Sequence, residues 1–116
     1  MKRDLSVFLK HIRDSITDIE TYTKDVDLPS FLTYTNKKTQ DAVVRRIEII
    51  GEAVRNLPSE DFRQEHPEVP WHQIAGMRHK LVHEYFGVDL ELVWQVVRHD
   101  LALLKKHVDE LLKQAA

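Results

Sequence analysis

The sequence predicts an all-α protein: an up-and-down bundle of four main helices with short helical segments between them. Three observations predict this class. Apolar side chains recur at steps of three and four through most of the chain. No segment alternates apolar and polar residues with period two, the pattern of a half-buried strand. Only three glycines occur in 116 residues, too few for the many tight turns of a β-sandwich. The length suits one domain, expected over residues 1–116.

The first main helix is expected from about Asp4 to Thr23. Residues 24–36 are rich in Asp, Pro, Ser and Asn, which predicts a loop, and residues 28–32 can form one helical turn within it. The apolar stripe that predicts the helix consists of Leu5, Phe8, Leu9, Ile12, Ile16 and Ile19.

The second main helix is expected from roughly Lys37 to Leu57, where Pro58 ends it. Gly51 lies inside this helix and costs about 1 kcal/mol relative to alanine, so we expect another helix to approach closely at this position. The stripe of this helix consists of Val43, Ile47, Ile50, Val54 and Leu57.

The second half of the chain is expected to hold two more main helices. A short helix over 59–65 is followed by a stiff connector over 66–70, which contains two prolines. A third main helix covers approximately Trp71–Tyr85, and Gly87 stops it. Asp89 can cap the last helix. Its stripe consists of Val93, Val97, Leu101, Leu104, Val108, Leu111 and Leu112.

Charge and composition restrict the function classes. The net charge is −2, with 17 basic and 19 acidic residues, so the whole molecule carries no strong nucleic-acid footprint. Any RNA-binding surface must therefore gather its positive charge locally. The absence of cysteine excludes a disulfide, an iron–sulfur cluster and a thiol nucleophile. The first residues lack the apolar core of a signal peptide, and no stretch approaches the ~20 apolar residues that span a bilayer. We therefore expect a soluble, cytoplasmic protein.

The segment from Met77 to Phe86 concentrates Arg, His and Tyr side chains. A neutral imidazole can accept a proton near pH 7, and a guanidinium can brace a phosphate through two parallel hydrogen bonds. These are two of the parts needed to cleave a phosphodiester without a metal. The pattern also fits a structural interpretation, in which Arg78 pairs with Glu84 or another acidic residue on the surface and His83 is a half-buried histidine.

Helix geometry separates the two candidate catalytic residues. At about 100° per residue, Arg78 and His83 point about 140° apart, whereas Arg78 and Tyr85 lie on nearly the same line. One straight helix does not easily bring Arg78 and His83 onto a single substrate atom, but two copies related by a two-fold axis do. A catalytic role therefore predicts an active homodimer, with Phe86 and Val88 among the candidate contacts.

The spacing Arg78-x4-His83-x-Tyr85, late in a small helical chain, resembles the Arg-x4-His-x-Tyr signature of the HepT-like family, which belongs to the HEPN superfamily. His79 follows the arginine, at a position where Asn is commoner in that family. Residues 46–53 resemble the central helix of the family. Residues 71–78 resemble its approach to the motif, so nearly the whole chain fits.

The resemblance implies the toxin of a toxin–antitoxin pair, a metal-independent endoribonuclease that works as a homodimer and needs no cofactor. It implies that Arg78 and His83 are the catalytic pair and that His79 is their supporting polar neighbour. The implied partners are RNA, as substrate, and a minimal nucleotidyltransferase antitoxin of the MntA type. That antitoxin would silence the toxin by transferring AMP from ATP to the motif tyrosine, here Tyr85.

Two other hypotheses remain open at this point. His72, His79 and His83 lie within about 40° of one another on one continuous helix and would offer ligands to zinc, provided that Gly76 does not interrupt the helix. Alternatively, the chain is a non-catalytic helical dimer that serves as binding partner and substrate of a nucleotidyltransferase. Its overall acidity favours the latter, although basic residues outnumber acidic ones on the second helix: Lys37, Lys38, Arg45, Arg46 and Arg55 against Asp41, Glu48 and Glu52.

Overall fold

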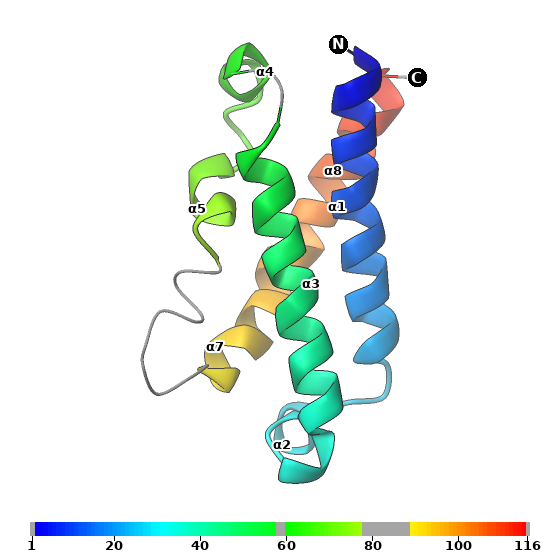
Figure 1. Ribbon diagram of the computed structural model, residues 1–116, viewed down its shortest axis with the longest axis vertical. Helices are drawn as coiled ribbons and strands as arrows, with labels where there is room; N and C mark the ends of the chain where they lie inside the picture. Colours follow the sequence, from blue (N-terminus) through cyan, green and yellow to red (C-terminus); the bar gives the residue numbers. More distant parts are fainter. Residues whose placement is uncertain (1, 58–59, 78–88, 116) are drawn as a thin grey trace.

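The computed structural model describes residues 2–57, 60–77 and 89–115. Within these ranges every regular element is helical (Figure 1), which confirms the predicted all-α class. The elements are α1 (Lys2–Tyr22), α2 (Leu28–Phe31), the 3₁₀ turn η1 (Tyr34–Asn36), α3 (Lys37–Arg55), α4 (Glu60–Glu65), α5 (Trp71–Ala75), α7 (Leu90–Gln95), the π-helical turn η2 (Val96–Asp100) and α8 (Leu101–Ala115).

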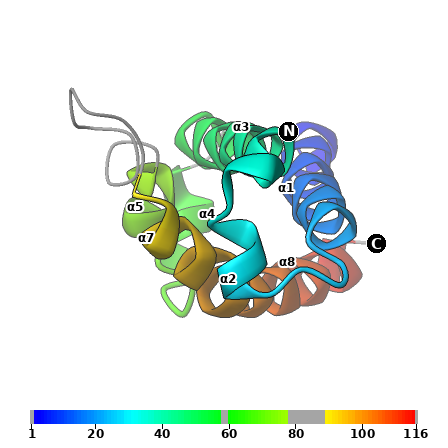
Figure 2. The same cartoon turned by 90° about the horizontal axis from the view of Figure 1, so that it is seen from below.

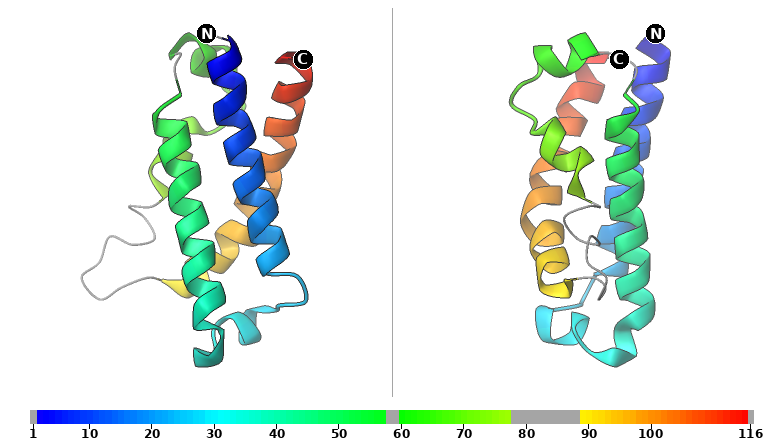
Figure 3. Two further views of the ribbon diagram at one scale, coloured as in Figure 1. Left: turned by 45° about the vertical axis from the view of Figure 1, so that its right-hand side comes forward. Right: turned by 60° about the vertical axis from the view of Figure 1, so that its left-hand side comes forward.

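The long helices run up and down. α1 descends from the end of the molecule where both termini lie, α3 returns beside it, and α8 rises in the same sense as α3 (Figures 1 and 3). α1 packs against both α3 and α8, while α5 packs against α3 (Figure 2). The small helix α2 closes the opposite end of the bundle, where it contacts α7.

The core is built from the apolar stripes that the sequence predicts. Burying one Leu or Ile side chain contributes roughly 1.5–3 kcal/mol, so these stripes determine which face of each helix turns inward. Leu5, Phe8, Val97 and Leu112 are only half-buried. The other stripe positions are buried, among them Leu9, Ile12, Ile16, Ile19, Val43, Ile47, Ile50, Val54, Val93, Leu101, Leu104, Val108 and Leu111.

The last helix contains a feature that periodicity alone did not predict. The backbone N–H of Leu101 donates to the carbonyl of Val96, five residues back, which makes η2 a π-helical turn. Val93, Val96 and Leu101 are all buried, so the inward positions step by three and then by five. The wider π turn accommodates the step of five, and it buries Val96 more deeply than Val97, which the sequence had placed in the stripe.

The helix expected over Trp71–Tyr85 is interrupted at Gly76, and Met77 is helical again. α5 ends at Ala75, and Gly76 caps it in a turn with φ −90° and ψ 0°. Two causes act together. Glycine is a poor helix former, and the carbonyl of Ala75 accepts a hydrogen bond from the side chain of Arg55. Residues 78–85 lie outside the described residues.

One other expected boundary shifts slightly. α3 ends at Arg55 rather than Leu57, although Leu57 is still buried. α2 confirms the helical turn expected within residues 28–32, and Asp27 caps it by accepting a hydrogen bond from the backbone N–H of Ser30 at 2.9 Å. None of the helices in the described part of the chain combines the length and apolarity needed to cross a bilayer.

Candidate functional site

The predicted site residues fall in the segment 78–88, outside the described residues. This applies to Arg78, His79, His83 and Tyr85, and also to the candidate dimer contacts Phe86 and Val88. The structure does describe both flanks of that segment. α5 and Met77 lead into it, and Asp89 and α7 follow it. The packing of these two flanks shows which helices of the bundle support the ends of the segment.

The entry flank is α5, which lies directly against α3. A Cβ atom at Gly51 would lie 3.3 Å from the carbonyl oxygen of Ile74 and 3.4 Å from that of Ala75. This confirms the close helix approach expected at Gly51 and identifies α5 as its partner. The Arg55 Nη2 donates to the Ala75 carbonyl at 3.2 Å. Met77 is 6% exposed. The residue immediately before Arg78 is therefore packed into the core.

The connector before α5 is held by aromatic contacts. Trp71 is buried, and its Nε1 donates to the carbonyl of His66 at 3.0 Å. The ring of Phe62 lies 5.8 Å from that of Trp71. The pKa of Glu68 lies below its usual value. The larger cause is a hydrogen bond that the carboxylate accepts from the backbone N–H of Glu68 itself, and the contact with His66 at 3.3 Å adds to it. The carboxylate of Glu68 is therefore already engaged by its own loop.

The exit flank is anchored at the other end of the bundle. Asp89 Oδ1 accepts a hydrogen bond from the backbone N–H of Leu92 at 3.1 Å and so caps α7, as the sequence predicted. Trp94 packs on Phe31 of α2 with 4.9 Å between ring centroids. The guanidinium of Arg98 lies 4.5 Å from the centre of the Trp94 ring. Two buried tryptophans, Trp71 and Trp94, thus pack at the two flanks of segment 78–88.

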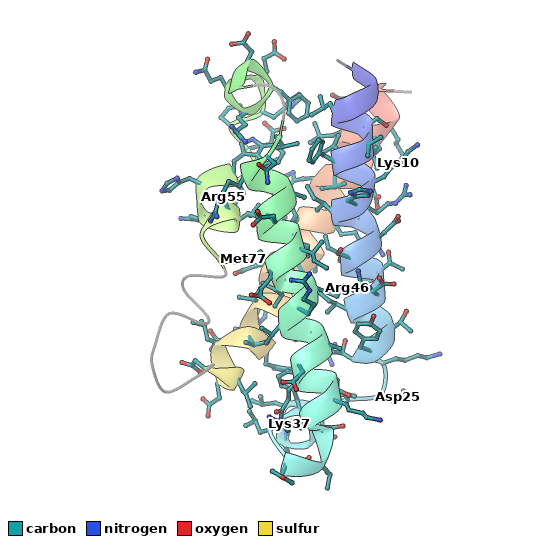
Figure 4. The ribbon with its side chains drawn as sticks, in the orientation of Figure 1. Lys10, Asp25, Lys37, Arg46, Arg55 and Met77 are labelled. Carbon is teal, nitrogen blue, oxygen red and sulfur yellow. The ribbon has the colours of Figure 1, made fainter. Side chains whose placement is uncertain are left out.

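An open groove of about 860 Å³ lies between the end of α3, α4 and α5, and we call it the α3–α5 groove. Figure 4 shows Arg55 extending from α3 toward α5 on its wall. Gly76, which stands two residues before Arg78 in the sequence, is among the residues that line the groove. Its described lining contains two arginines and no carboxylate: Val54, Arg55, Arg63, Gln64, Val69, Pro70, Trp71, His72, Gln73, Ala75 and Gly76.

A second hollow, of about 630 Å³, lies on the other side of α5, between α5 and the last helix. Its lining includes His72, Asp100 and His107 beside apolar side chains such as Leu103. No three His, Asp or Glu residues in ranges 2–57, 60–77 and 89–115 lie close enough to hold a metal ion. The zinc hypothesis also required one continuous helix from His72 to His83. α5 ends at Ala75, and His79 and His83 lie outside the described residues.

Comparison with known proteins identifies the family. The family model described as "Ribonuclease HepT-like" matches residues 12–111, which include the whole segment 78–88. The chain belongs to the HepT-like ribonuclease family. The resemblance inferred from the motif is thereby confirmed. No solved structure matches the chain.

Two relatives show how the HepT-like chain corresponds to whole proteins. It is 45% identical over 113 residues to "Probable ribonuclease HepT" of Thermococcus cleftensis, a match that covers 97% of this chain and all of that protein. It is 47% identical over 114 residues to "Gamma-glutamylcyclotransferase and putative RNase" of Methanocaldococcus jannaschii. The second match covers 98% of this chain but spans half of the relative's length.

The α3–α5 groove shows what the sequence pattern did not predict in this HepT-like chain. Arg55 had been recognised only as one of the charges on the second helix, and Arg63 had not been singled out. Each alone looks like a solvated charge. They line one groove because α4 lies at the end of α3, where Arg63 donates to the carbonyl of Val54 at 2.7 Å.

Proposed function

We propose that the chain is a metal-independent endoribonuclease, the toxin of a toxin–antitoxin pair, which acts as a homodimer. The observation that carries this proposal is the family match, because its span includes the motif Arg78-x4-His83-x-Tyr85. The ribonuclease name of the full-length relative in Thermococcus cleftensis supports the same activity.

In the proposed reaction, His83 is the general base and takes the proton of a ribose 2′-OH. The 2′ oxygen then attacks the adjacent phosphorus, the bond from phosphorus to the 5′ oxygen breaks, and the departing 5′ oxygen takes up a proton from solvent. The products are a 2′,3′-cyclic phosphate and a 5′-OH. Arg78 offsets the negative charge that grows on the phosphoryl oxygens, and His79 is the polar neighbour that supports the pair. None of these steps uses a metal ion or a cofactor.

Tyr85 is the proposed point of control. A minimal nucleotidyltransferase antitoxin of the MntA type transfers AMP from ATP to the tyrosine oxygen and releases pyrophosphate. Residues seven apart lie on nearly the same line of a helix, so the added phosphate lies close to Arg78. The modification fills the cleft and competes with RNA phosphate for the guanidinium.

The test is cleavage of RNA by wild type, Arg78→Ala and His83→Ala, followed on sequencing gels in the presence of a chelator. Positioned acid–base catalysis contributes about 10²–10⁴-fold, so we expect His83→Ala to lose activity by a factor in this range. Arg78→Ala should be comparably impaired. Equal cleavage by all three proteins would contradict the assignment of the catalytic pair.

A second measurement addresses the antitoxin. After co-expression with a small nucleotidyltransferase, intact mass should increase by AMP units in wild type but not in Tyr85→Phe. If AMP is added to a dimer that never cleaves RNA, the non-catalytic partner hypothesis replaces the toxin proposal.

A further inference from the structure

The α3–α5 groove has an electrostatic character that the molecule as a whole lacks. The chain carries a net charge of −2. Among the described residues that line the groove, Arg55 and Arg63 are basic and none is acidic. Positive charge gathered in this way in a hollow is what attracts a polyanion, since the phosphates supply most of the affinity of nucleic-acid binding. Because the net charge of the chain is negative, any RNA-binding surface on it needs such a local concentration of positive charge.

Hydrogen bonds fix the two guanidinium groups on the groove wall. Arg55 donates from Nη2 to the Ala75 carbonyl at 3.2 Å, and its side chain is exposed. Arg63 donates from Nη2 to the carbonyls of Val54 and Arg55, at 2.7 and 3.2 Å. A guanidinium has five N–H donors, so the anchored Arg55 retains donors for a phosphate. A preoriented group also loses less side-chain entropy when it binds.

The rest of the lining indicates which part of a nucleic acid the groove contacts. Trp71 is 6% exposed, so it forms the floor of the groove and offers no open face on which a base can stack. His72 and Gln73 are exposed and present polar groups that can hydrogen-bond to ribose hydroxyls and phosphates. The groove therefore suits the sugar–phosphate backbone and does not select a sequence by stacking.

We propose that the α3–α5 groove holds the backbone of single-stranded RNA beside the scissile linkage, with Arg55 as a phosphate contact. The inference rests on the proposed ribonuclease function and extends it from the catalytic pair to the path of the strand. Gly76 lines the groove and stands two residues before Arg78 in the sequence, so the groove lies where the chain enters the catalytic motif.

The test measures RNA affinity in variants that change charge on the same helix. Arg55→Gln alters the groove, and Arg45→Gln is its matched control, since Arg45 lies in a separate hollow of α3 beside Glu48 and Glu52. Both are placed in a His83→Ala background so that RNA stays intact, and a fluorescent single-stranded RNA is titrated by anisotropy. We expect Arg55→Gln to raise Kd about tenfold at low salt and to reduce the salt slope of log K by about 0.7. Arg45→Gln should change Kd less than about twofold.

A second pair of variants separates binding from folding, because Arg55→Gln also removes the contact with Ala75. Gln73→Glu adds a negative charge to the groove and leaves that contact in place, and Gln114→Glu adds the same charge at an exposed position of α8. Gln73→Glu should raise Kd several-fold relative to Gln114→Glu, with similar melting temperatures. The proposal is overturned if neither groove variant differs from its control, or if Arg55→Gln weakens binding of the purified antitoxin instead of RNA.

The outcomes distinguish the groove from the catalytic assignment. If RNA binding depends on Arg55 but the protein never cleaves RNA, the RNA-binding role of the groove is supported and the proposed ribonuclease function is contradicted. If Arg55→Gln, made in the otherwise wild-type chain, leaves the rate and KM of RNA cleavage unchanged, the RNA-binding role of the groove is contradicted and the ribonuclease function is supported.

Discussion

At the scale of single residues, Asp89 controls the point where the chain enters α7 after the motif segment. Its backbone is extended, with φ −82° and ψ 96°, while Oδ1 accepts the N–H of Leu92. The first N–H groups of a helix have no partner within the helix, so this side chain satisfies one of them. Asp27 does the same for α2 through the N–H of Ser30. Capping by Asp89 was predicted from residue type and position alone.

Replacing Asp89 by alanine removes this acceptor, and we expect the free energy of unfolding to fall by about 1 kcal/mol. Asp89→Asn is the matched control, because asparagine caps a helix about as well as aspartate and should leave most of the stability. Urea unfolding followed by circular dichroism measures both. Equal stability of the two variants would mean that the cap does not contribute.

At the scale of elements, the contact between α5 and α3 determines where the motif segment begins. Gly51 permits the close approach, and Arg55, one turn further along α3, holds the carbonyl of Ala75. The sequence indicated that some helix approaches Gly51. It did not indicate that this helix is α5, because the pairing joins elements separated by the whole of α4 and its connectors.

A leucine at Gly51 would meet the backbone oxygens of Ile74 and Ala75 and push α5 away from α3. We expect Gly51→Leu to lower the free energy of unfolding by roughly 1–3 kcal/mol, because overpacking outweighs the gain in helix propensity. Asp41→Leu places the same side chain at an exposed position of α3 and should change stability by less than about 0.5 kcal/mol. Denaturant unfolding compares them, and a Gly51→Leu protein as stable as wild type would refute this role of the contact.

At the scale of the whole molecule, the proposed chemistry depends on two chains. The angle of about 140° between Arg78 and His83 on a straight helix led to the expectation that each active site combines residues of both subunits. This arrangement requires stable association, since Arg78 and His83 of one straight helix cannot both reach a single phosphate. Subunit mixing tests it directly.

Mixing equal amounts of Arg78→Ala and His83→Ala chains makes half of the dimers hybrid, each with one intact shared site. We expect ribonuclease activity to recover to about a quarter of the wild-type value. As control, Arg78→Ala is mixed with the double variant Arg78→Ala/His83→Ala, a combination that cannot assemble an intact site. Activity that stays at the level of the single variants after subunit exchange would show that each chain supplies its own pair.

Local pattern by itself determined the helical class, the inward positions of the main stripes, the Asp89 cap and the motif that indicated the family, because each depends on residues within a few turns of one another. The tertiary structure decided the break at Gly76 and the convergence of Arg55 and Arg63 on one groove. It also decided the π turn, since the bundle buries Val96 and Leu101 together. These features depend on contacts between residues distant in the chain, whose energies leave no periodic trace in the sequence.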